Sequence, residues 1–296
     1  PLKMKRIGIY GKSIAEQNYK FIKTLLDCVR ENINPEIFLH KNLSNIPNLF
    51  DKENDQLFDG DDLIESKVEL LISFGGDGTL LDTVTMIKDS NIPILGINAG
   101  RLGFLANITQ DDILSAVNAI KENKYRIDDR TLVEVYNYED LNGVNCNFAL
   151  NEITIHKKDS SSMLKIHTYV DNEFLNTYWS DGLIVSTPTG STAYSLSCGG
   201  PILSPGSDNL IINPISPHNL NLRPMVVSDN VEIKLQTESR EGQFLLTMDS
   251  RSLTVENNAP IILRKSNFSI KLVELPDQNF FKTIRNKLFW GKDSRN

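Results

Sequence analysis

Cysteine is scarce in this chain of 296 residues, and the three cysteines, Cys28, Cys146 and Cys198, form no CxxC pair. Small secreted proteins usually carry an even disulfide framework, so this pattern favours a reducing compartment, and we predict a cytoplasmic protein. The four histidines are scattered along the chain, and no zinc site with local ligand spacing is visible in the sequence.

Long hydrophobic runs and excess basic charge are also missing. No apolar run approaches the roughly 20 residues of a membrane span, so no membrane partner is expected. The formal net charge of -7 argues against a nucleic-acid partner, because nucleic-acid binders usually carry a basic face. An anionic substrate would therefore need local positive charge from a metal ion, from Lys or Arg, or from helix N-termini.

Two familiar nucleotide motifs do not occur. Without GxxxxGK[ST], a phosphotransferase of this sequence would lack the P-loop lysine and belong to another class. Without GxGxxG, an ordinary Rossmann enzyme of hydride transfer is disfavoured.

The first part of the chain alternates between strand-like and helical patterns. Apolar strands are expected at 5–10, 36–39, 68–74 and 92–97, and helices after Gly11, from about Thr79, and at 111–121. Such alternation is typical of βαβ units, so residues 1–130 are predicted to form a doubly wound, Rossmann-like α/β domain. The stretch 41–65 is rich in Asp and Asn, and we expect it to be a mobile loop.

Short strand-like segments separated by turn residues dominate the chain after Arg130. Residues 131–275 are therefore predicted to form a mostly-β domain. The tail 276–296 returns to helical spacing between Gln278 and Trp290, and we expect this C-terminal helix to pack on the first domain or on a partner.

The first candidate site is Gly75-Gly76-Asp77-Gly78-Thr79, between a buried strand and a helix. Glycines let the backbone approach an anion, and the helix N-terminus offers free N–H groups. A carboxylate is unfavourable beside phosphate, so Asp77 suggests a Mg²⁺ ligand or a proton acceptor. The alternative is a tight turn in which Asp77 caps the helix.

Two further candidate sites follow strands. Asn98-Ala99-Gly100-Arg101-Leu102-Gly103-Phe104-Leu105 lies at the edge of the sheet where α/β folds bind ligands, and Arg101 and Phe104 could contact a nucleotide. The pair Asn151-Glu152 is a good clamp for a ribose diol, since a carboxylate accepts from two hydroxyls. Core packing, surface exposure or a turn are the alternatives for these residues.

The most specific segment is Ser180-Asp181-Gly182-Leu183-Ile184-Val185 with the hydroxyl- and glycine-rich run from Ser186 to Pro201. Packing gives no reason for so many hydroxyls, whereas hydroxyl-rich turns bind phosphates, sugars and base edges.

Together these segments resemble the NAD kinase family, in order and spacing. GGDGT alone is shared with diacylglycerol and sphingosine kinases, but the run Thr187–Pro201 resembles NAD kinases specifically. Ser216-Pro217-His218 and Arg223-Pro224 are similar to a later family signature, and the resemblance covers about residues 68–251.

The resemblance implies an enzyme that transfers the γ-phosphoryl of ATP to the 2′-hydroxyl of the adenosine ribose of NAD. It implies Asp77 as proton acceptor, Gly78 at the nucleotide, Asn151 and Glu152 on the ribose and Asp181 at the nicotinamide carboxamide. The adenosine would be lined by hydroxyl-rich residues, namely Thr189, Thr192, Ala193, Tyr194, Ser195, Leu196 and Ser197. It also implies a homodimer or homotetramer, with a site in the cleft between the domains.

Two residues depart from the family pattern near these positions. Trp179 stands where many bacterial relatives carry Arg or Gly, and Arg251 stands where Gln is common.

The transferring phosphoryl group is expected to be neutralised by Mg²⁺, whose ligands are left unassigned, and by the backbone N–H groups of 75–79. The rival functions are a lipid kinase that shares GGDGT and a non-catalytic dinucleotide-sensing module.

Overall fold

The computed structural model describes residues 4–60, 62–137, 146–158, 163–257, 260–276 and 278–291. The chain divides into two compact units. Unit 1 comprises residues 1–129 and 270–296, and unit 2 comprises residues 130–269. Among the described residues, no helix has the length and apolar character needed to cross a membrane.

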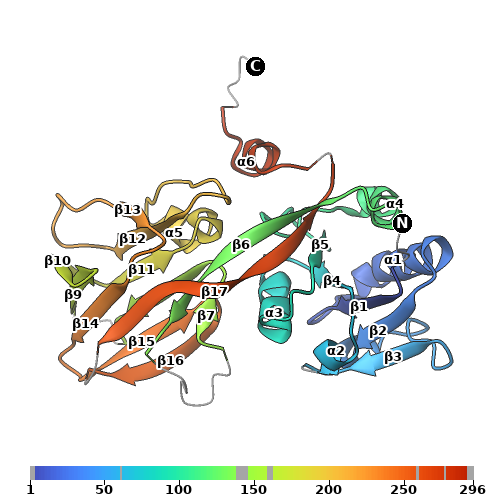
Figure 1. Ribbon diagram of the computed structural model, residues 1–296, viewed down its shortest axis with the longest axis horizontal. Coiled ribbons are helices and arrows are strands. Elements are labelled where there is room, and N and C mark those ends of the chain that lie inside the picture. The colour runs from blue at the N-terminus through green and yellow to red at the C-terminus, as the bar shows by residue number, and fades with distance from the viewer. Residues whose placement is uncertain are drawn as a thin grey trace. The chain divides into compact units, whose positions relative to one another are not determined.

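Unit 1 is an α/β unit built on a parallel sheet (Figure 1). Its strands are β1 (Arg6–Tyr10), β2 (Glu36–His40), β3 (Asp55–Phe58), β4 (Leu70–Gly75) and β5 (Ile94–Asn98). Its helices are α1 (Tyr19–Asn32), α2 (Asp62–Glu65), α3 (Asp77–Ile87), α4 (Ile113–Lys121) and α6 (Phe280–Leu288), with short 3₁₀ turns η1 (Glu16–Asn18), η2 (Lys41–Leu43) and η3 (Gln110–Asp112).

The strand order of this sheet is β3-β2-β1-β4-β5, with the last residues of β17 beside β5. Helices cover both faces, with α1 and α4 on one and α2 and α3 on the other (Figure 1). The alternation of β4 explains this arrangement: Leu70, Ile72 and Phe74 pack in one core cluster with α1, while Leu71 faces the other way. The predicted doubly wound α/β domain is thus confirmed.

One helix of unit 1 starts slightly earlier than expected, and one prediction about this unit was wrong. Helix α3 begins at Asp77, two residues before Thr79, with Gly76 as its N-cap. The acidic stretch 41–65 is not a bare loop, because it contains η2, α2 and β3, and β3 pairs in parallel with β2. The acidic composition of this stretch obscured its apolar residues, four of which are buried in the structure: Leu43, Leu49, Phe58 and Leu63. Asp61 lies outside the described residues.

Unit 2 is mostly β, as predicted, and its strands form two antiparallel sheets (Figure 1). One sheet has the order β13-β12-β11-β8-β15-β16, and the other contains β10-β9-β14-β17 with β6 and β7. The strands are β6 (Arg126–Val135), β7 (Phe148–Ala149), β8 (Glu152–His156), β9 (Leu164–Val170), β10 (Glu173–Ser180), β11 (Gly182–Ser186), β12 (Asn209–Ile215), β13 (Met225–Ser228), β14 (Ile233–Glu238), β15 (Gln243–Met248), β16 (Arg251–Glu256) and β17 (Ile261–Glu274). The only helical pieces among its described residues are η4 (Thr189–Thr192) and α5 (Tyr194–Ser197).

The core of unit 2 lies between these two sheets. Ile155 and Leu183 come from the first sheet, Leu164 and Ile233 from the second, and all four belong to one buried cluster. Alternating apolar residues along each strand therefore make a sandwich core. The strands β6 and β17 each run on into unit 1.

Candidate functional site

Two of the predicted segments leave neighbouring strands of unit 1 at the same edge. Gly75 at the end of β4 stands beside Asn98 at the end of β5, and the Ala99 N–H donates to the Gly75 carbonyl at 3.0 Å. Parallel strands share one carboxyl edge, so the GGDGT turn and the loop 98–106 are brought together.

Asp77 is held by that second loop. Its Oδ1 accepts the N–H groups of Leu105 at 3.0 Å and Ala106 at 2.9 Å, and its Oδ2 accepts that of Phe104 at 2.9 Å. A carboxylate oxygen has two acceptor positions, so Oδ2 keeps one position for a further donor. Asp77 belongs to the first turn of α3 but does not cap it, since Gly76 is the N-cap.

The glycines around Asp77 fall into two groups. A Cβ on Gly103 would stand 2.0 Å from Asp77 Oδ1, so glycine is needed there for the carboxylate to approach the loop. A Cβ on Gly76 or Gly78 would meet no protein atom within 4 Å, and neither residue has a positive φ. Packing within the described chain therefore does not require glycine at these two positions, whereas close approach by a ligand would.

The other predicted residues of this edge differ in their exposure. Asn98 is buried, and its amide donates to the carbonyls of Arg101 and Ala106 while its Oδ1 accepts the Gly100 N–H. Asn98 thus organises the loop. Arg101 is exposed, and Phe104 is partly buried.

A lysine that sequence reasoning missed lies at Asp77. The Nζ atom of Lys287, in α6, is 3.9 Å from Asp77 Oδ2 and 4.7 Å from the centre of the Phe104 ring. No local motif marks this lysine, because its neighbours in the tail form an ordinary amphipathic helix.

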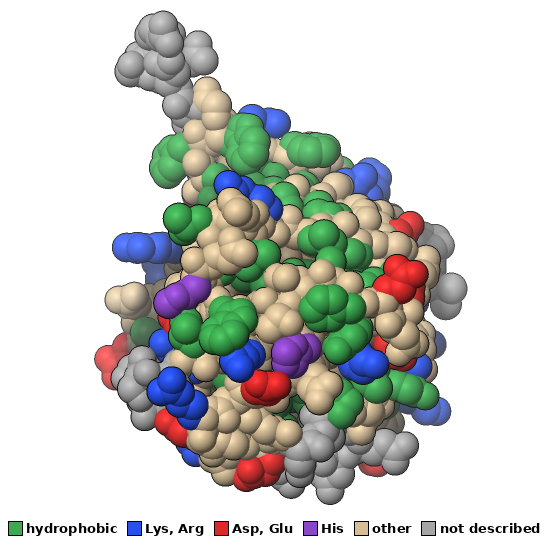
Figure 2. Space-filling view, turned by 90° about the vertical axis from the view of Figure 1, so that its left-hand side faces the viewer, with side chains coloured by type: hydrophobic (Ala, Val, Ile, Leu, Met, Phe, Trp, Pro, Cys, Tyr) green, Lys and Arg blue, Asp and Glu red, His purple; other side chains and the backbone are tan. Residues whose placement is uncertain are grey.

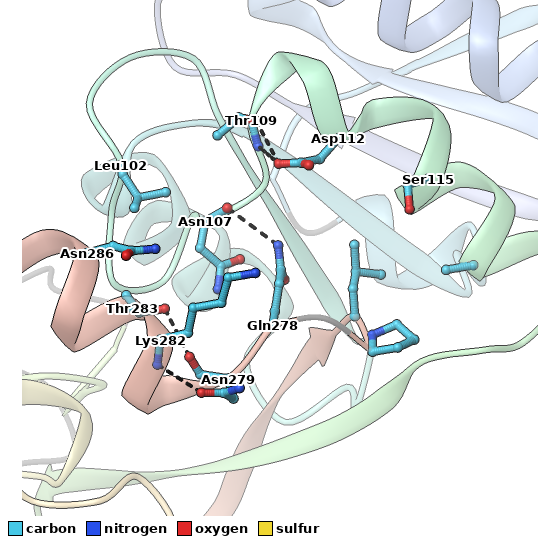
Figure 3. Close-up of a pocket in the computed structure, with 13 residues that line it drawn as sticks. Leu102, Asn107, Thr109, Asp112, Ser115, Gln278, Asn279, Lys282, Thr283 and Asn286 are labelled. Atoms are coloured by element: carbon cyan, nitrogen blue, oxygen red, sulfur yellow. Dashed lines mark hydrogen bonds between the residues drawn. The ribbon is translucent and has the colours of Figure 1, made fainter.

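A polar pocket of about 230 Å³ lies beside this edge, between the loop 102–109, α4 and the start of α6 (Figure 3). The Gln278 amide donates to the Asn107 carbonyl at 3.4 Å across it, and Asn279 caps α6 by accepting the Lys282 N–H at 2.8 Å. The Gln278–Asn107 hydrogen bond attaches the start of α6 to the end of the loop that holds Asp77.

Glu152 in unit 2 is anchored through its backbone to Asp249. The N–H groups of Leu150, Asn151 and Glu152 donate to the Asp249 carboxylate at 2.9, 2.8 and 3.3 Å, and the Asp249 N–H donates back to the Glu152 carbonyl at 3.0 Å. Asp249 was not among the predicted site residues. It lies in the turn just before Arg251, and acidic side chains in turns often accept backbone N–H groups.

The Glu152 side chain is only 8% exposed, and its Oε2 has no hydrogen-bond partner among the described residues. Burial, reinforced by the Asp249 carboxylate, raises the pKa of Glu152 to about 8, while the Tyr194 backbone N–H acts in the opposite direction. Burial also raises the pKa of Asp249, against its three backbone donors and Arg251. A buried carboxyl oxygen without a partner is costly unless a ligand supplies one.

The hydroxyl-rich turn folds onto the Asn151-Glu152 pair. The Thr187 N–H donates to the Asn151 carbonyl at 2.9 Å, and the Thr187 hydroxyl donates to the Leu150 carbonyl at 2.5 Å. A Cβ on Gly190 would stand 2.1 Å from the Asn151 carbonyl oxygen, so only glycine permits this approach. The structure therefore brings the third and fourth predicted segments together.

The predicted adenosine residues differ in how far their side chains are already engaged. Ser195 is buried and accepts from the Asn213 amide, and the Thr192 hydroxyl donates to the Thr189 carbonyl. Tyr194 and Ser197 are exposed, and Ala193 and Leu196 are partly buried. Thr189 is buried, and its hydroxyl accepts from Arg130 at 3.3 Å.

Asp181 and Arg251 both have partners within unit 2. Asp181 forms an ion pair of 2.6 Å with Lys157, which the sequence analysis had not singled out. The Arg251 guanidinium donates to the carbonyls of Cys146, at 2.7 Å, and Phe148. Arg251 therefore ties the start of β16 to the segment that leads into Asn151.

Among the described residues no group of three or more His, Cys, Asp or Glu side chains could hold a metal ion. Magnesium in phosphoryl-transfer sites is usually bound by one or two carboxylates together with the phosphates of the nucleotide.

Family models and individual relatives match almost the whole chain. The ATP-NAD kinase N-terminal domain matches residues 9–125, and the ATP-NAD kinase C-terminal domain matches residues 150–275. The NAD kinase of Flavobacterium psychrophilum is 44% identical over 98% of this chain and 100% of its own length. The NAD kinase of Cytophaga hutchinsonii is 52% identical over 78% of each chain.

Solved structures show the same fold. Yeast NADH kinase, crystallised with NADH, has a TM-score of 0.86 at 21% identity and covers 99% of this chain and 89% of its own. An NAD kinase from Archaeoglobus fulgidus, crystallised with ATP, has a TM-score of 0.70 at 24% identity and covers 97% of this chain and 99% of its own.

Proposed function

Since this chain belongs to the NAD kinase family and phosphorylates NAD with ATP, we propose that Asp77 accepts the proton of the reacting hydroxyl and that Glu152 binds the ribose. One observation carries the first assignment. Asp77 is oriented by three backbone N–H groups and keeps one acceptor position on Oδ2, in a turn whose Gly76 and Gly78 face open space. Orientation matters here because phosphoryl transfer to an alcohol depends mainly on in-line geometry and charge neutralisation.

The phosphoryl group lands on the 2′-hydroxyl of the adenosine ribose in this proposal. The unpartnered Oε2 of Glu152 supports a ribose ligand, because a hydroxyl would satisfy it. Asn151 adds an amide beside it, and Asp181 is assigned to the nicotinamide carboxamide. The adenosine is assigned to Thr189, Thr192, Ala193, Tyr194, Ser195, Leu196 and Ser197. Arg101 and Phe104, held near Asp77 by the loop, are assigned to the nucleotide.

Mg²⁺ bound to the phosphates of ATP would supply charge neutralisation there. The backbone N–H groups at the start of α3 add positive potential at the same edge. Asn98 and Arg251 act through the loops that they organise, because their polar atoms are engaged within the chain.

The assignment is tested by incubating the purified protein with Mg-ATP and NAD and measuring NADP with an NADP-specific dehydrogenase. Phosphorus NMR of the product should show a 2′-phosphate. An NAD analogue without the adenosine 2′-hydroxyl should bind and stay unphosphorylated. A 3′-phosphate would overturn the proposed geometry.

Self-association is proposed for unit 2, in line with the homodimer or homotetramer that the family resemblance implies. Figure 2 shows hydrophobic side chains over the face where β9, β10 and β13 lie. The exposed residues there include Phe174 and Trp179 on β10 and Met225 and Val226 on β13. Among the described strands, β10 and β13 each stand at the end of a sheet, so each offers an unpaired edge of the kind that proteins normally cover.

Two further proposals concern the domain boundary and the location of the protein in the cell. One family model ends at residue 125 and the other begins at residue 150, which supports a domain boundary between these residues, near the predicted residue 130. A cytoplasmic location is proposed as well, because Cys28 and Cys198 are free thiols.

A further inference from the structure

The C-terminal helix α6 carries Lys287 to the candidate catalytic edge of its own unit. Thr283 and Ile284 are the buried residues of α6, and Lys287 follows them by four and three positions. Residues with this spacing share a helix face, so Lys287 points towards the same side as the buried residues. The Asn279 cap defines the start of the helix, and the Gln278–Asn107 hydrogen bond holds that start against the rest of unit 1 (Figure 3).

The lysine stands near Asp77 without occupying it. A separation of 3.9 Å between Nζ and Oδ2 is too long for a hydrogen bond, so the remaining acceptor position of Oδ2 stays available to a hydroxyl. The ammonium also lies 4.7 Å from the Phe104 ring, a cation–π contact that favours this position of the side chain. About one third of the lysine side chain is exposed, which leaves it open to a ligand.

Phosphate binding at the GGDGT turn requires a nearby cation. Phosphate oxygens close to Asp77 would be repelled by its carboxylate, and the GGDGT turn contains no basic residue. Among the described residues, Lys287 is the one cationic side chain that forms an ion pair with Asp77. The net charge of the whole chain, -7, gives no general attraction for ATP.

We propose that Lys287 is a further catalytic residue, whose ammonium contacts the γ-phosphoryl oxygens of ATP and stabilises the charge on them during transfer. The inference rests on the proposed role of Asp77, because that role places the transferring group. A reacting hydroxyl that is hydrogen-bonded to Asp77 has its oxygen about 3 Å from Oδ2. The γ-phosphorus of ATP lies about 3–3.5 Å beyond that hydroxyl oxygen before attack. Phosphoryl oxygens at that position are within reach of a flexible lysine whose Nζ lies 3.9 Å from Oδ2.

The step balances without another reactant. The 2′-oxygen of the adenosine ribose forms a bond to the γ-phosphorus while the bond from that phosphorus to the β,γ-bridging oxygen breaks. Asp77 takes the hydroxyl proton, and ADP leaves with the bond electrons. Lys287 takes no part in proton transfer. It serves as the cation at the γ-phosphate, as the P-loop lysine does in other enzymes.

Replacement of Lys287 by Met tests this role, because Met keeps an apolar stem and removes the charge. We expect kcat/KM for ATP to fall by roughly 10²–10³-fold, as for loss of one charge-stabilising donor, with the Kd for NAD within about threefold by calorimetry. The preference for ATP over ADP in binding should also fall, because the lost contact is to the γ-phosphate. Lys287→Arg should keep more than about a tenth of wild-type turnover, since it keeps the cation. Arg285→Met, an equal loss of charge on the exposed side of α6, is the matched control and should leave turnover within about twofold.

Several results would overturn the inference. These are Lys287→Met turnover within threefold of wild type, an equal loss in Arg285→Met, or a Lys287→Arg protein that melts normally but is as inactive as Lys287→Met. If Lys287→Met does not fold, the Lys287→Arg and Lys287→Gln pair decides, with activity expected to follow charge. Failure of the Asp77 assignment looks different, because Asp77→Asn would then stay active. Absence of NADP formation by the wild-type protein would reject the function itself.

Discussion

Asp77 and Glu152 are carboxyl groups in opposite environments. Asp77 is partly exposed and accepts three backbone N–H groups, whereas Glu152 is buried and its Oε2 has no partner among the described residues. Asp77 is oriented before any substrate binds, whereas Glu152 keeps a buried oxygen that a ligand can satisfy. This difference separates the proposed proton acceptor from the proposed ribose ligand.

Asp77→Asn is expected to lower kcat by at least 10²-fold, because general-base roles are typically worth about 10²–10⁴-fold. The affinity for NAD should change by only a few-fold, since the ribose and adenosine contacts are assigned to other residues. Steady-state kinetics and calorimetry measure the two effects, and a thermal melt checks that the variant stays folded. Turnover above about a tenth of wild type would remove Asp77 from the proton-acceptor role.

Glu152 should make stability depend on pH. Its pKa in the folded protein, about 8, lies above its ordinary value of 4.5, so folding favours the protonated form. The stabilisation is fully present below pH 4.5 and is lost as the pH rises towards 8, by at most about 1.4 kcal/mol per pH unit. Glu152→Gln removes this titration, so the free energy of unfolding of wild type relative to the variant should fall between pH 5 and pH 8. Urea denaturation at both pH values measures it, and an unchanged difference would contradict the burial of an unpartnered carboxyl.

At the scale of elements, the segment 41–65 shows how buried contacts can lie inside an acidic stretch. Asp55 accepts from Arg30 at 2.6 Å and from the Asp51 N–H at 2.9 Å, and its side chain is almost fully buried. The carboxylate thus joins β3 to α1, an interaction that composition alone does not reveal.

Asp55→Ala is expected to destabilise the protein by about 2–3 kcal/mol, because it removes the buried carboxylate that pairs with Arg30 and leaves the guanidinium with the Leu49 carbonyl, the exposed Asp27 and solvent. Asp55→Asn is the control and should cost less, since its oxygen still accepts the Asp51 N–H. Urea unfolding curves give both values. A loss below about 0.5 kcal/mol would mean that β3 contributes little to the fold, as a mobile loop would.

At the scale of the whole molecule, the exposed face of β10 and β13 predicts assembly. Phe174→Asp should shift sedimentation towards smaller species, because a charge would be buried at the proposed interface. Phe281→Asp is the control, since Phe281 is just as exposed but lies on α6. Unaltered sedimentation in Phe174→Asp would assign self-association to another surface.

The sequence by itself determined the fold class, the family and the neighbourhood of two motifs. GGDGT and the loop 98–106 each follow a buried apolar strand, and adjacent parallel strands must end at one edge, so local patterns sufficed to bring them together. The hydroxyl-rich run was recognisable from its composition, although the structure shows that some of its hydroxyls, such as those of Thr187 and Ser191, are buried and bonded within the chain. Its assigned contacts with adenosine stay predictions.

Only the tertiary structure decided which distant residues complete these segments. Periodicity shows which face of α6 is apolar, but not which surface that face covers, so nothing local placed Lys287 beside Asp77. The same holds for Asp249, whose carboxylate collects the N–H groups of Leu150, Asn151 and Glu152 across two strands. Such contacts depend on how strands pair and helices dock, and they arise from the burial of the whole chain rather than from any short stretch of it.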